Sequence, residues 1–361
     1  MTDKLKLGIA GIKPGDNTLH GFAIAKDDTC IPLDDIELVA ACDVREENVR
    51  GTRERSLFRD VYTDYREMIE KADLDAVLIR LPTFLHKQAT IDCLKAGLHV
   101  LCEKPPTCTY EEMLDVAKVA RSSPGKYMFV RQSRFLPSVQ AARRMVQEGK
   151  LGEVYCAESR WIRSRGKQIL GNAWRSEKER GGGVLLDLGV HGIDQAWFAM
   201  DKPKPVEVTA ATFTAFKQYA TDPNTYSADD TVAGMIRFES GAVLACLFAF
   251  GMNAVGPQNP NQPDKPYATD WQVSRLFGTE GGLDIQKGEL IHGPVDSVEV
   301  EPLPANGYPS GSPMVLQARE FIRAIRTDTT PLNSLDDALA LMRMLSGLIQ
   351  SGETKRSVRL N

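Results

Sequence analysis

Short hydrophobic runs alternate with amphipathic stretches in the first third of the chain. The hydrophobic runs cover residues 5–10, 36–42, 75–80, 99–102 and 127–130. Stretches with helical spacing of apolar residues separate them, over residues 46–55, 64–71, 86–96 and 110–121. Buried strands that alternate with amphipathic helices are typical of βαβ units and a parallel sheet. The pattern therefore predicts a doubly wound, Rossmann-like α/β domain.

The pattern changes beyond the fifth of these runs. A helix is predicted over residues 137–147, and strand-like runs follow at 154–161, 206–216, 230–238, 243–250 and 271–278. Gly241 lies between two of these runs and predicts a hairpin. Two amphipathic helices are predicted at residues 315–326 and 335–349. We therefore predict a second, α+β domain on an open, mainly antiparallel sheet flanked by helices, with domains at 1–128 and 129–361.

Composition excludes several classes of protein. The chain has 361 residues and a net charge of −4, with acidic and basic residues interspersed, which gives no basic surface for nucleic acid or membranes. The seven cysteines form no CxxC pair, so neither a zinc site nor a disulfide framework is expected. The N-terminal apolar stretch ends at Gly11, too early for a signal peptide, and we expect a cytoplasmic protein. Residues 253–270 hold four prolines and are expected to form a long loop.

The end of the first predicted strand has an incomplete glycine motif. A dinucleotide site needs glycine where the strand turns into a helix, so that the backbone can approach the pyrophosphate. Gly11 fits the first glycine, Lys13 stands where the second would be, and Gly15 only approximates the third. Lys13 could supply charge in place of a close backbone approach.

Asp43, at the end of the second predicted strand, supports the nucleotide site. An acidic residue there binds the ribose hydroxyls and repels a 2′-phosphate, which favours NAD over NADP. Its separation from Gly11 exceeds the usual interval of about 20 residues, which we assign to an extra loop at residues 29–32. Two alternatives remain, because Arg45 is compatible with NADP and Asp43 could simply cap a helix.

Two further groups carry candidate chemistry. Glu103 and Lys104 end the fourth strand and are followed by two prolines, which places an ammonium group where parallel sheets bind ligands. Gly181, Gly182 and Gly183 precede Asp187 and His191, whose i, i+4 spacing puts them on one helix face. An aspartate beside a histidine can orient it as a base for an alcohol.

In this order, the motifs resemble the family of glucose-fructose oxidoreductase, inositol dehydrogenase and the rhizopine catabolism protein. The resemblance extends over nearly the whole chain. It is carried by Asp75-Ala76-Val77, Pro82-Thr83 with His86, the Ala96 to Pro105 block, Arg134-Phe135 with Pro137, the Gly149 to Val154 block, Trp174-Arg175, and the Gly181 to His191 run. Lys13 and Arg80 depart from the usual pattern of the family.

The resemblance implies roles for matching positions. Lys104, Asp187 and His191 would be catalytic, with His191 as the base, and the peptide before Pro105 could be cis. Cofactor contacts would come from Gly11, Ile12, Lys13, Asp43, Val44, Leu81, Pro82, Thr83, His86, Glu103, Lys104, Trp174 and Arg175. Substrate contacts would come from Lys104, Arg134, Trp174, Asp187 and His191.

The expected function is NAD(P)-dependent hydride transfer to or from a sugar, cyclitol or related polyol, in a homodimer or homotetramer. Arg163, Arg165 and Lys167 could face an acidic or richly hydroxylated ligand, or could form a solvated surface. Two alternatives share the fold: a glycosidase that oxidises and eliminates with tightly held NAD, and a non-catalytic nucleotide-sensing regulator.

Overall fold

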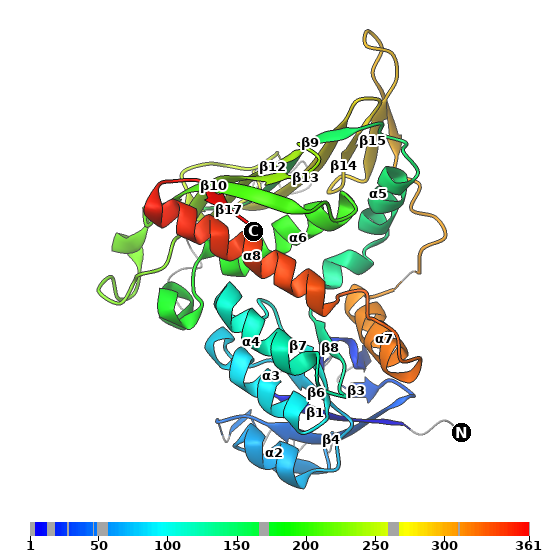
Figure 1. Ribbon diagram of the computed structural model, residues 1–361, viewed down its shortest axis with the longest axis vertical. Helices are drawn as coiled ribbons and strands as arrows, with labels where there is room; N and C mark the ends of the chain where they lie inside the picture. Colours follow the sequence, from blue (N-terminus) through cyan, green and yellow to red (C-terminus); the bar gives the residue numbers. More distant parts are fainter. Residues whose placement is uncertain are drawn as a thin grey trace. The chain divides into compact units, whose positions relative to one another are not determined.

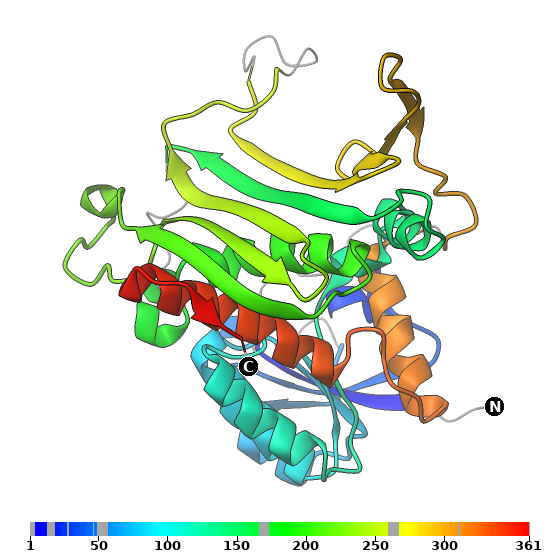
Figure 2. The same cartoon turned by 45° about the horizontal axis from the view of Figure 1, so that its top comes forward.

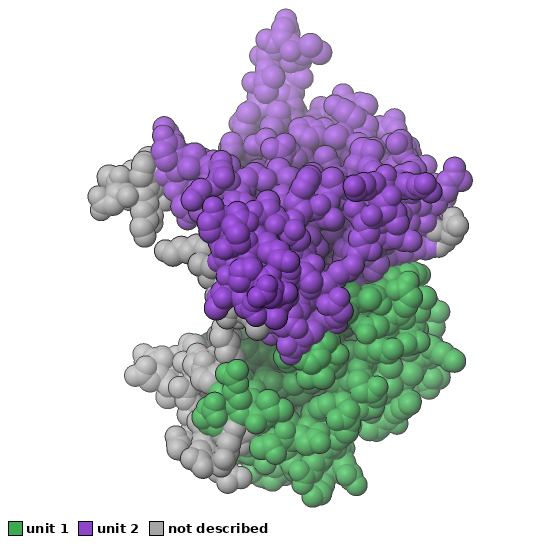
Figure 3. Space-filling model, turned by 90° about the vertical axis from the view of Figure 1, so that its left-hand side faces the viewer, with its two compact units in different colours: residues 1–135, 310–339 green, residues 136–309, 340–361 purple. Residues whose placement is uncertain are grey.

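A computed structural model of the chain describes residues 4–12, 19–26, 29–45, 47–48, 57–165, 173–258, 267–309 and 311–360. The chain forms two compact units (Figure 3). Unit 1 contains residues 1–135 and 310–339, and unit 2 contains residues 136–309 and 340–361. The sequence places a single boundary at residue 128, whereas here the chain returns to unit 1 near its C-terminus.

Unit 1 is built on a six-stranded parallel sheet in the order β5-β4-β1-β6-β7-β8. Its strands are β1 Leu5–Ala10, β4 Ile36–Cys42, β5 Asp60–Tyr62, β6 Ala76–Ile79, β7 His99–Cys102 and β8 Tyr127–Phe129. Helices α2 Tyr65–Lys71, α3 His86–Lys95 and α4 Tyr110–Ala120 connect successive strands (Figure 1). This is the strand order of dinucleotide-binding folds, and it confirms the predicted doubly wound domain.

Two parts of unit 1 differ from the sequence expectation. Residues 29–32 form strand β3 (Thr29–Pro32), which pairs with β2 (Ala23–Lys26) in an antiparallel ribbon instead of a loop. Helix α7 (Pro313–Arg326) belongs to this unit because its apolar face joins the core of the sheet. The ring of Phe321 packs edge-on against Phe22, with centroids 6.2 Å apart. The helix expected at 46–55 lies mostly outside the described residues.

Unit 2 contains a nine-stranded sheet in the order β16-β15-β14-β13-β9-β12-β11-β10-β17 (Figure 2). The strands are β9 Val154–Ser164, β10 Pro205–Phe213, β11 Thr231–Phe238, β12 Val243–Met252, β13 Asp270–Gly278, β14 Gly282–Asp284, β15 Glu289–His292, β16 Glu299–Pro302 and β17 Val358–Arg359. Only β9 and β12 pair in parallel among these described strands, so the mainly antiparallel prediction is confirmed. Gly241, at φ +91°, turns β11 into β12 as predicted.

Three helices belong wholly or largely to unit 2. These are α5 (Pro137–Gln147), α6 (Val190–Ala199) and α8 (Leu335–Thr354), whose first turn is assigned to unit 1. A π-helical segment, Leu185–Gly189, leads directly into α6. A Cβ atom at Gly192 would lie 2.5 Å from the Ser159 hydroxyl and 2.6 Å from the Phe248 ring, so glycine lets α6 approach the sheet closely. His191, the neighbour of Gly192, is thereby held near strand β9.

Candidate functional site

The loops that follow β1, β4, β6 and β7 meet at one edge of the unit 1 sheet. Gly11 and Ile12 follow β1, Asp43 follows β4, Leu81 and its neighbours follow β6, and Glu103 follows β7. Parallel strands place all these loops at the carboxyl edge, where nucleotides bind. Gly11 has φ +93°, and a Cβ there would lie 2.6 Å from the Arg80 carbonyl oxygen. Glycine is therefore required where the β1 loop crosses the end of β6.

Asp43 joins two of these loops through its carboxylate. One oxygen accepts a hydrogen bond from the Ile12 N–H at 3.0 Å, and the other accepts one from the Arg45 N–H at 2.9 Å. The second bond closes a turn directly after β4, and both oxygens retain lone pairs for a ribose. The helix that Asp43 could cap lies mostly outside the described residues. The neighbouring Val44 side chain is 83% exposed, an apolar surface suited to a purine face. Lys13 lies outside the described residues.

His86 holds two turns of this edge together. Its Nδ1 lies 2.8 Å from the Pro105 carbonyl oxygen, and its Nε2 lies 2.7 Å from that of Leu81. The side chain is buried, and burial lowers the pKa of the imidazole. His86 therefore connects the turn that contains Pro82 and Thr83 to the turn that follows Lys104, and its ring is enclosed by the protein.

Glu103 is paired with His20, a residue that the sequence analysis did not single out. Its Oε1 lies 2.5 Å from His20 Nε2, and its Oε2 accepts the Lys104 N–H at 2.7 Å. Burial favours the neutral acid, but His20 and Lys104 outweigh it and lower the pKa of Glu103 to about 2. An ionised Glu103 thus braces the backbone of Lys104, whose bond to Pro105 is cis as expected.

In unit 2, the glycine run packs against the protein's own backbone. A Cβ at Gly182 would lie 2.4 Å from the Arg175 carbonyl oxygen, which also accepts the Gly183 N–H at 3.0 Å. Arg175 belongs to the short 3₁₀ turn Ala173–Ser176, and its guanidinium stacks 4.5 Å from the centroid of the Trp174 ring. The glycines therefore join the Trp174 turn to the start of the helix that carries Asp187.

Asp187 and His191 lie on either side of a change in helix geometry. Asp187 is in the π-helical segment and His191 is in the first turn of α6. The sequence predicted one α-helix that carries both residues, whereas Asp187 lies in a π-helical segment. Such segments are frequent at functional sites. The His191 ring packs edge-on against Trp161 of β9, with centroids 5.6 Å apart and planes at 61°. Trp161 thus forms one wall beside the candidate base.

The arginines near Trp161 are engaged by neighbouring side chains. Asp270 accepts the Trp161 indole N–H at 2.6 Å and the Arg163 Nε–H at 3.0 Å. Arg165 donates to the Asn253 side-chain oxygen at 2.6 Å. Lys167 lies outside the described residues. The Arg163 charge is therefore balanced within unit 2.

Arg134 occupies a structural position in unit 1. Its side chain is fully buried, and its guanidinium bonds Asp337 at 2.6 Å and the Leu332 carbonyl oxygen at 3.1 Å. A guanidinium that is enclosed in a core and paired there has no surface for a ligand. We therefore do not keep the expected substrate contact at Arg134.

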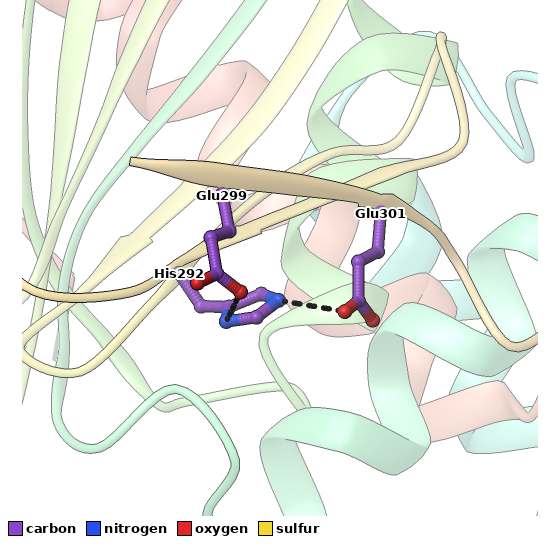
Figure 4. A group of neighbouring side chains, drawn as sticks. All are labelled: His292, Glu299 and Glu301. Carbon is purple, nitrogen blue, oxygen red and sulfur yellow. Dashed lines mark ion pairs between the residues drawn. The ribbon is translucent and has the colours of Figure 1, made fainter. Parts of the chain in front are cut away.

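One group of potential metal ligands lies on the β15–β16 hairpin among the described residues. Glu299 is 3.8 Å from His292 Nδ1, whereas Glu301 is 3.4 Å from His292 Nε2 (Figure 4). The two carboxylates thus approach opposite nitrogens of one imidazole, which is the geometry of two ion pairs across strands. A metal ion binds one nitrogen of a histidine and needs the other ligands on that same side.

Comparison with known families agrees with this architecture. Residues 5–130 match the model described as the oxidoreductase family, NAD-binding Rossmann fold, and residues 139–284 match the GFO/IDH/MocA C-terminal domain. The chain belongs to the GFO/IDH/MocA oxidoreductase family. Unit 1 therefore contains the family's NAD-binding domain, which agrees with the strand order and with the loops at its carboxyl edge. The described helices include none with the length and apolar character needed to cross a membrane.

Curated relatives and a solved structure are similar to this chain. D-glucoside 3-dehydrogenase of Escherichia coli K12 is 31% identical over 61% of this chain and 64% of its own length. 1,5-anhydro-D-fructose reductase of Ensifer adhaerens is 30% identical over 65% of this chain and 64% of its own. The matched part of the chain thus spans less than two thirds of these relatives. A levoglucosan dehydrogenase with bound NADH and levoglucosan has the same fold, with a TM-score of 0.80, 21% identity and 99% of both chains covered.

Proposed function

We propose that this protein is an NAD-dependent dehydrogenase that reversibly oxidises a secondary ring hydroxyl of a neutral sugar or glycoside. The observation that carries the proposal is the Asp187–His191 pair on a braced helix, with the His191 ring against Trp161. A histidine oriented by its surroundings is suited to take a proton from an alcohol. The three named relatives act on sugars or sugar derivatives, which supports this substrate class.

Unit 1 has residues that fit the cofactor. Gly11 leaves the close crossing that a Cβ would fill, and the Asp43 carboxylate would bind the adenosine ribose hydroxyls. Val44 would cover the adenine, and the turn from Leu81 to Thr83, held by His86, would line the nicotinamide side. An ionised Asp43 disfavours a 2′-phosphate, so NAD is proposed over NADP.

Bound NAD would accept the hydride from the substrate carbon, and the residues of this chain would handle the proton. His191 would take the hydroxyl proton, while Asp187 would orient the imidazole or accept a hydrogen bond from a neighbouring hydroxyl. The Lys104 ammonium would stabilise the developing negative charge on the reacting oxygen. We propose Lys104, Asp187 and His191 as the catalytic residues.

A neutral substrate is favoured by the pairing of the local charges. Asp270 balances the charge of Arg163, so this arginine offers no excess positive charge to a substrate carboxylate. An indole ring suits the C–H face of a pyranose, because that face is apolar while the sugar rim is polar. The side chains of Trp174 and Arg175 would extend this surface.

A substrate panel with both cofactors tests the proposal. We expect NAD reduction with glucosides and anhydro-sugars, slower reduction of NADP, and weak activity with the matching uronic acids. Lys104→Ala should lose at least about 100-fold in kcat/KM, whereas Lys204→Ala, at an exposed ion pair with Glu239, should not change it. Full activity of Lys104→Ala would overturn the assignment. Glycoside cleavage without net NADH would instead indicate the oxidation and elimination chemistry.

We also propose a homodimer or homotetramer formed through the open face of the nine-stranded sheet. Strand alternation places Phe213, Ala211, Ala233 and Ala245 on the face away from α6 and α8, and all four are exposed. Exposed apolar side chains on a sheet face are suited to contact with a second copy. Light scattering should give the mass of an oligomer, and Ala233→Arg should reduce it. A monomeric mass for the unaltered protein would refute this.

A further inference from the structure

Asp229 lies at the start of the helix that carries the candidate base. The Val184 N–H donates to the Asp229 carbonyl oxygen at 2.9 Å, and the Asp229 carboxylate faces the N–H groups of Leu185 and Val184, which favour its ionised form. The first N–H groups of a helix have no partner within the helix, and a carboxylate is among the best acceptors for them. Asp229 thus caps this helix from a segment more than 40 positions further along the chain.

Gly183 leaves the space that this carboxylate occupies. Its φ is +110°, and a Cβ there would lie 2.8 Å from Asp229 Oδ1 and 3.2 Å from Asp229 Cγ. Any side chain at position 183 would strike the carboxyl group. The last glycine of the run and the aspartate are therefore two halves of one packing arrangement.

The same segment also holds the Trp174 turn. Ser176 accepts the N–H groups of Ser227 and Ala228 at 2.9 and 3.0 Å, and Arg175 accepts the Gly183 N–H at 3.0 Å. The segment before Asp229, the Trp174 turn and the helix start are therefore connected by backbone hydrogen bonds. A shift of Asp229 would displace both groups of predicted substrate contacts in unit 2.

We propose that Asp229 is a positioning residue that holds Asp187 and His191 in their working geometry. This deepens the proposed function and rests on it. The Asp229 carboxylate makes no contact with the reacting atoms in this proposal. It acts through the helix start, as a cap whose loss lets the first turn, and with it the π segment, move.

The carboxylate is retained at a cost to the fold. Its Oδ2 is buried and accepts no hydrogen bond from the described residues. Burial raises the pKa of Asp229 to about 6, with a further contribution from Asp230, against the opposing effect of the backbone N–H groups. Its titratable neighbours are Asp230 and Tyr226, while Arg175 and Glu177 face the glycine run through their carbonyl groups. A residue that lowers the free energy of unfolding at neutral pH is expected to have a functional role.

Asp230 provides a matched control for the test. It is also a buried carboxylate, but it accepts the Phe216 N–H at 2.7 Å and the Thr231 hydroxyl at 3.0 Å, away from the helix start. The variants Asp229→Ala, Asp229→Asn and Asp230→Asn therefore separate the helix cap from a general effect of losing an acidic group in this segment.

The first measurement is amide hydrogen exchange of the peptide around Val184 and Leu185 in the full-length protein. Loss of one helix cap corresponds to roughly fivefold faster exchange in Asp229→Ala, and Asp230→Asn should leave this peptide unchanged. Unchanged exchange in Asp229→Ala would overturn the structural part of the proposal, and this readout does not depend on any substrate.

The second measurement is steady-state kinetics on the best substrate of the panel. Asp229→Ala should lower kcat by about ten- to hundredfold with unchanged NAD affinity, because misplacement of the base affects the chemical step. Asp229→Asn should lose less, since its amide oxygen still accepts, and Asp230→Asn should stay within about twofold of the unaltered enzyme. Unchanged kcat in Asp229→Ala, or a loss in Asp230→Asn as large as that in Asp229→Ala, would refute positioning. If Asp229→Ala exchanges faster but the unaltered protein turns over no sugar, the capping role is supported and the proposed function is rejected.

Discussion

Replacing Asp229 by asparagine should make the protein's stability less dependent on pH. The pKa of this carboxyl rises from 3.8 to about 6 in the folded chain, because burial penalises the charged form. Between these values the folded state binds more protons than the unfolded state, so the contribution to stability is present at low pH and lost as pH rises through 6. A shift of about two pKa units corresponds to ~3 kcal/mol in total, of which about 1.4 kcal/mol is lost between pH 5 and pH 8.

The assay is a thermal melt of the unaltered protein and of Asp229→Asn at matched pH values. All other titrating groups are shared, so the difference in Tm isolates Asp229. We expect the Tm of the variant, relative to that of the unaltered protein, to rise by about 3–5 °C from pH 5 to pH 8 for a unit of this size. The reasoning would be refuted if this difference stayed constant across that range.

Three further changes test other parts of the molecule. Asp43→Asn removes the charge and keeps an acceptor oxygen for only one of the Ile12 and Arg45 N–H groups, so the ratio of kcat/KM for NAD to that for NADP should fall by about tenfold; an unchanged ratio would contradict a ribose-binding role. Trp161→Ala should raise KM for the sugar by about tenfold with unchanged NAD affinity, which a titration of both ligands checks. Arg134→Leu removes the guanidinium that pairs with the buried Asp337 carboxylate, and should lower the free energy of unfolding in denaturant by about 3–5 kcal/mol. Replacing an exposed ligand-contact residue would lower it far less.

Much of the fold could be predicted because its signals are local. Strands β1, β4 and β7 are short apolar runs that the sheet buries, and their predicted limits agree with the structure. The β3 strand was missed because Thr29–Pro32 is a short run that ends in proline, typical of a loop. It pairs with the neighbouring strand β2, and no property of the four residues alone indicates that pairing.

The candidate site shows the same division. Lys104 could be placed because the end of a parallel strand is readable from the sequence, and the structure puts it after β7. The His20–Glu103 pair could not be predicted, because it joins positions far apart in the chain. Arg134 was misjudged since a charged side chain is expected at the surface, and its buried partner Asp337 lies some 200 positions away.

The glycine run shows that the sequence can indicate a close contact without indicating which residue makes it. Three successive glycines indicate a close backbone approach, and in the sequence they precede Asp187 and His191. The structure places the Arg175 carbonyl against Gly182 and the Asp229 carboxylate against Gly183. Because an aspartate just before a strand is usually interpreted as part of a turn, nothing local marked Asp229 as the cap of a distant helix. If that cap orients His191, then Gly183→Ala should reproduce the kinetic defect of Asp229→Ala, since the added Cβ would displace the same carboxylate. A normal kcat in Gly183→Ala would show that the packing of Gly183 against Asp229 does not control the orientation of His191.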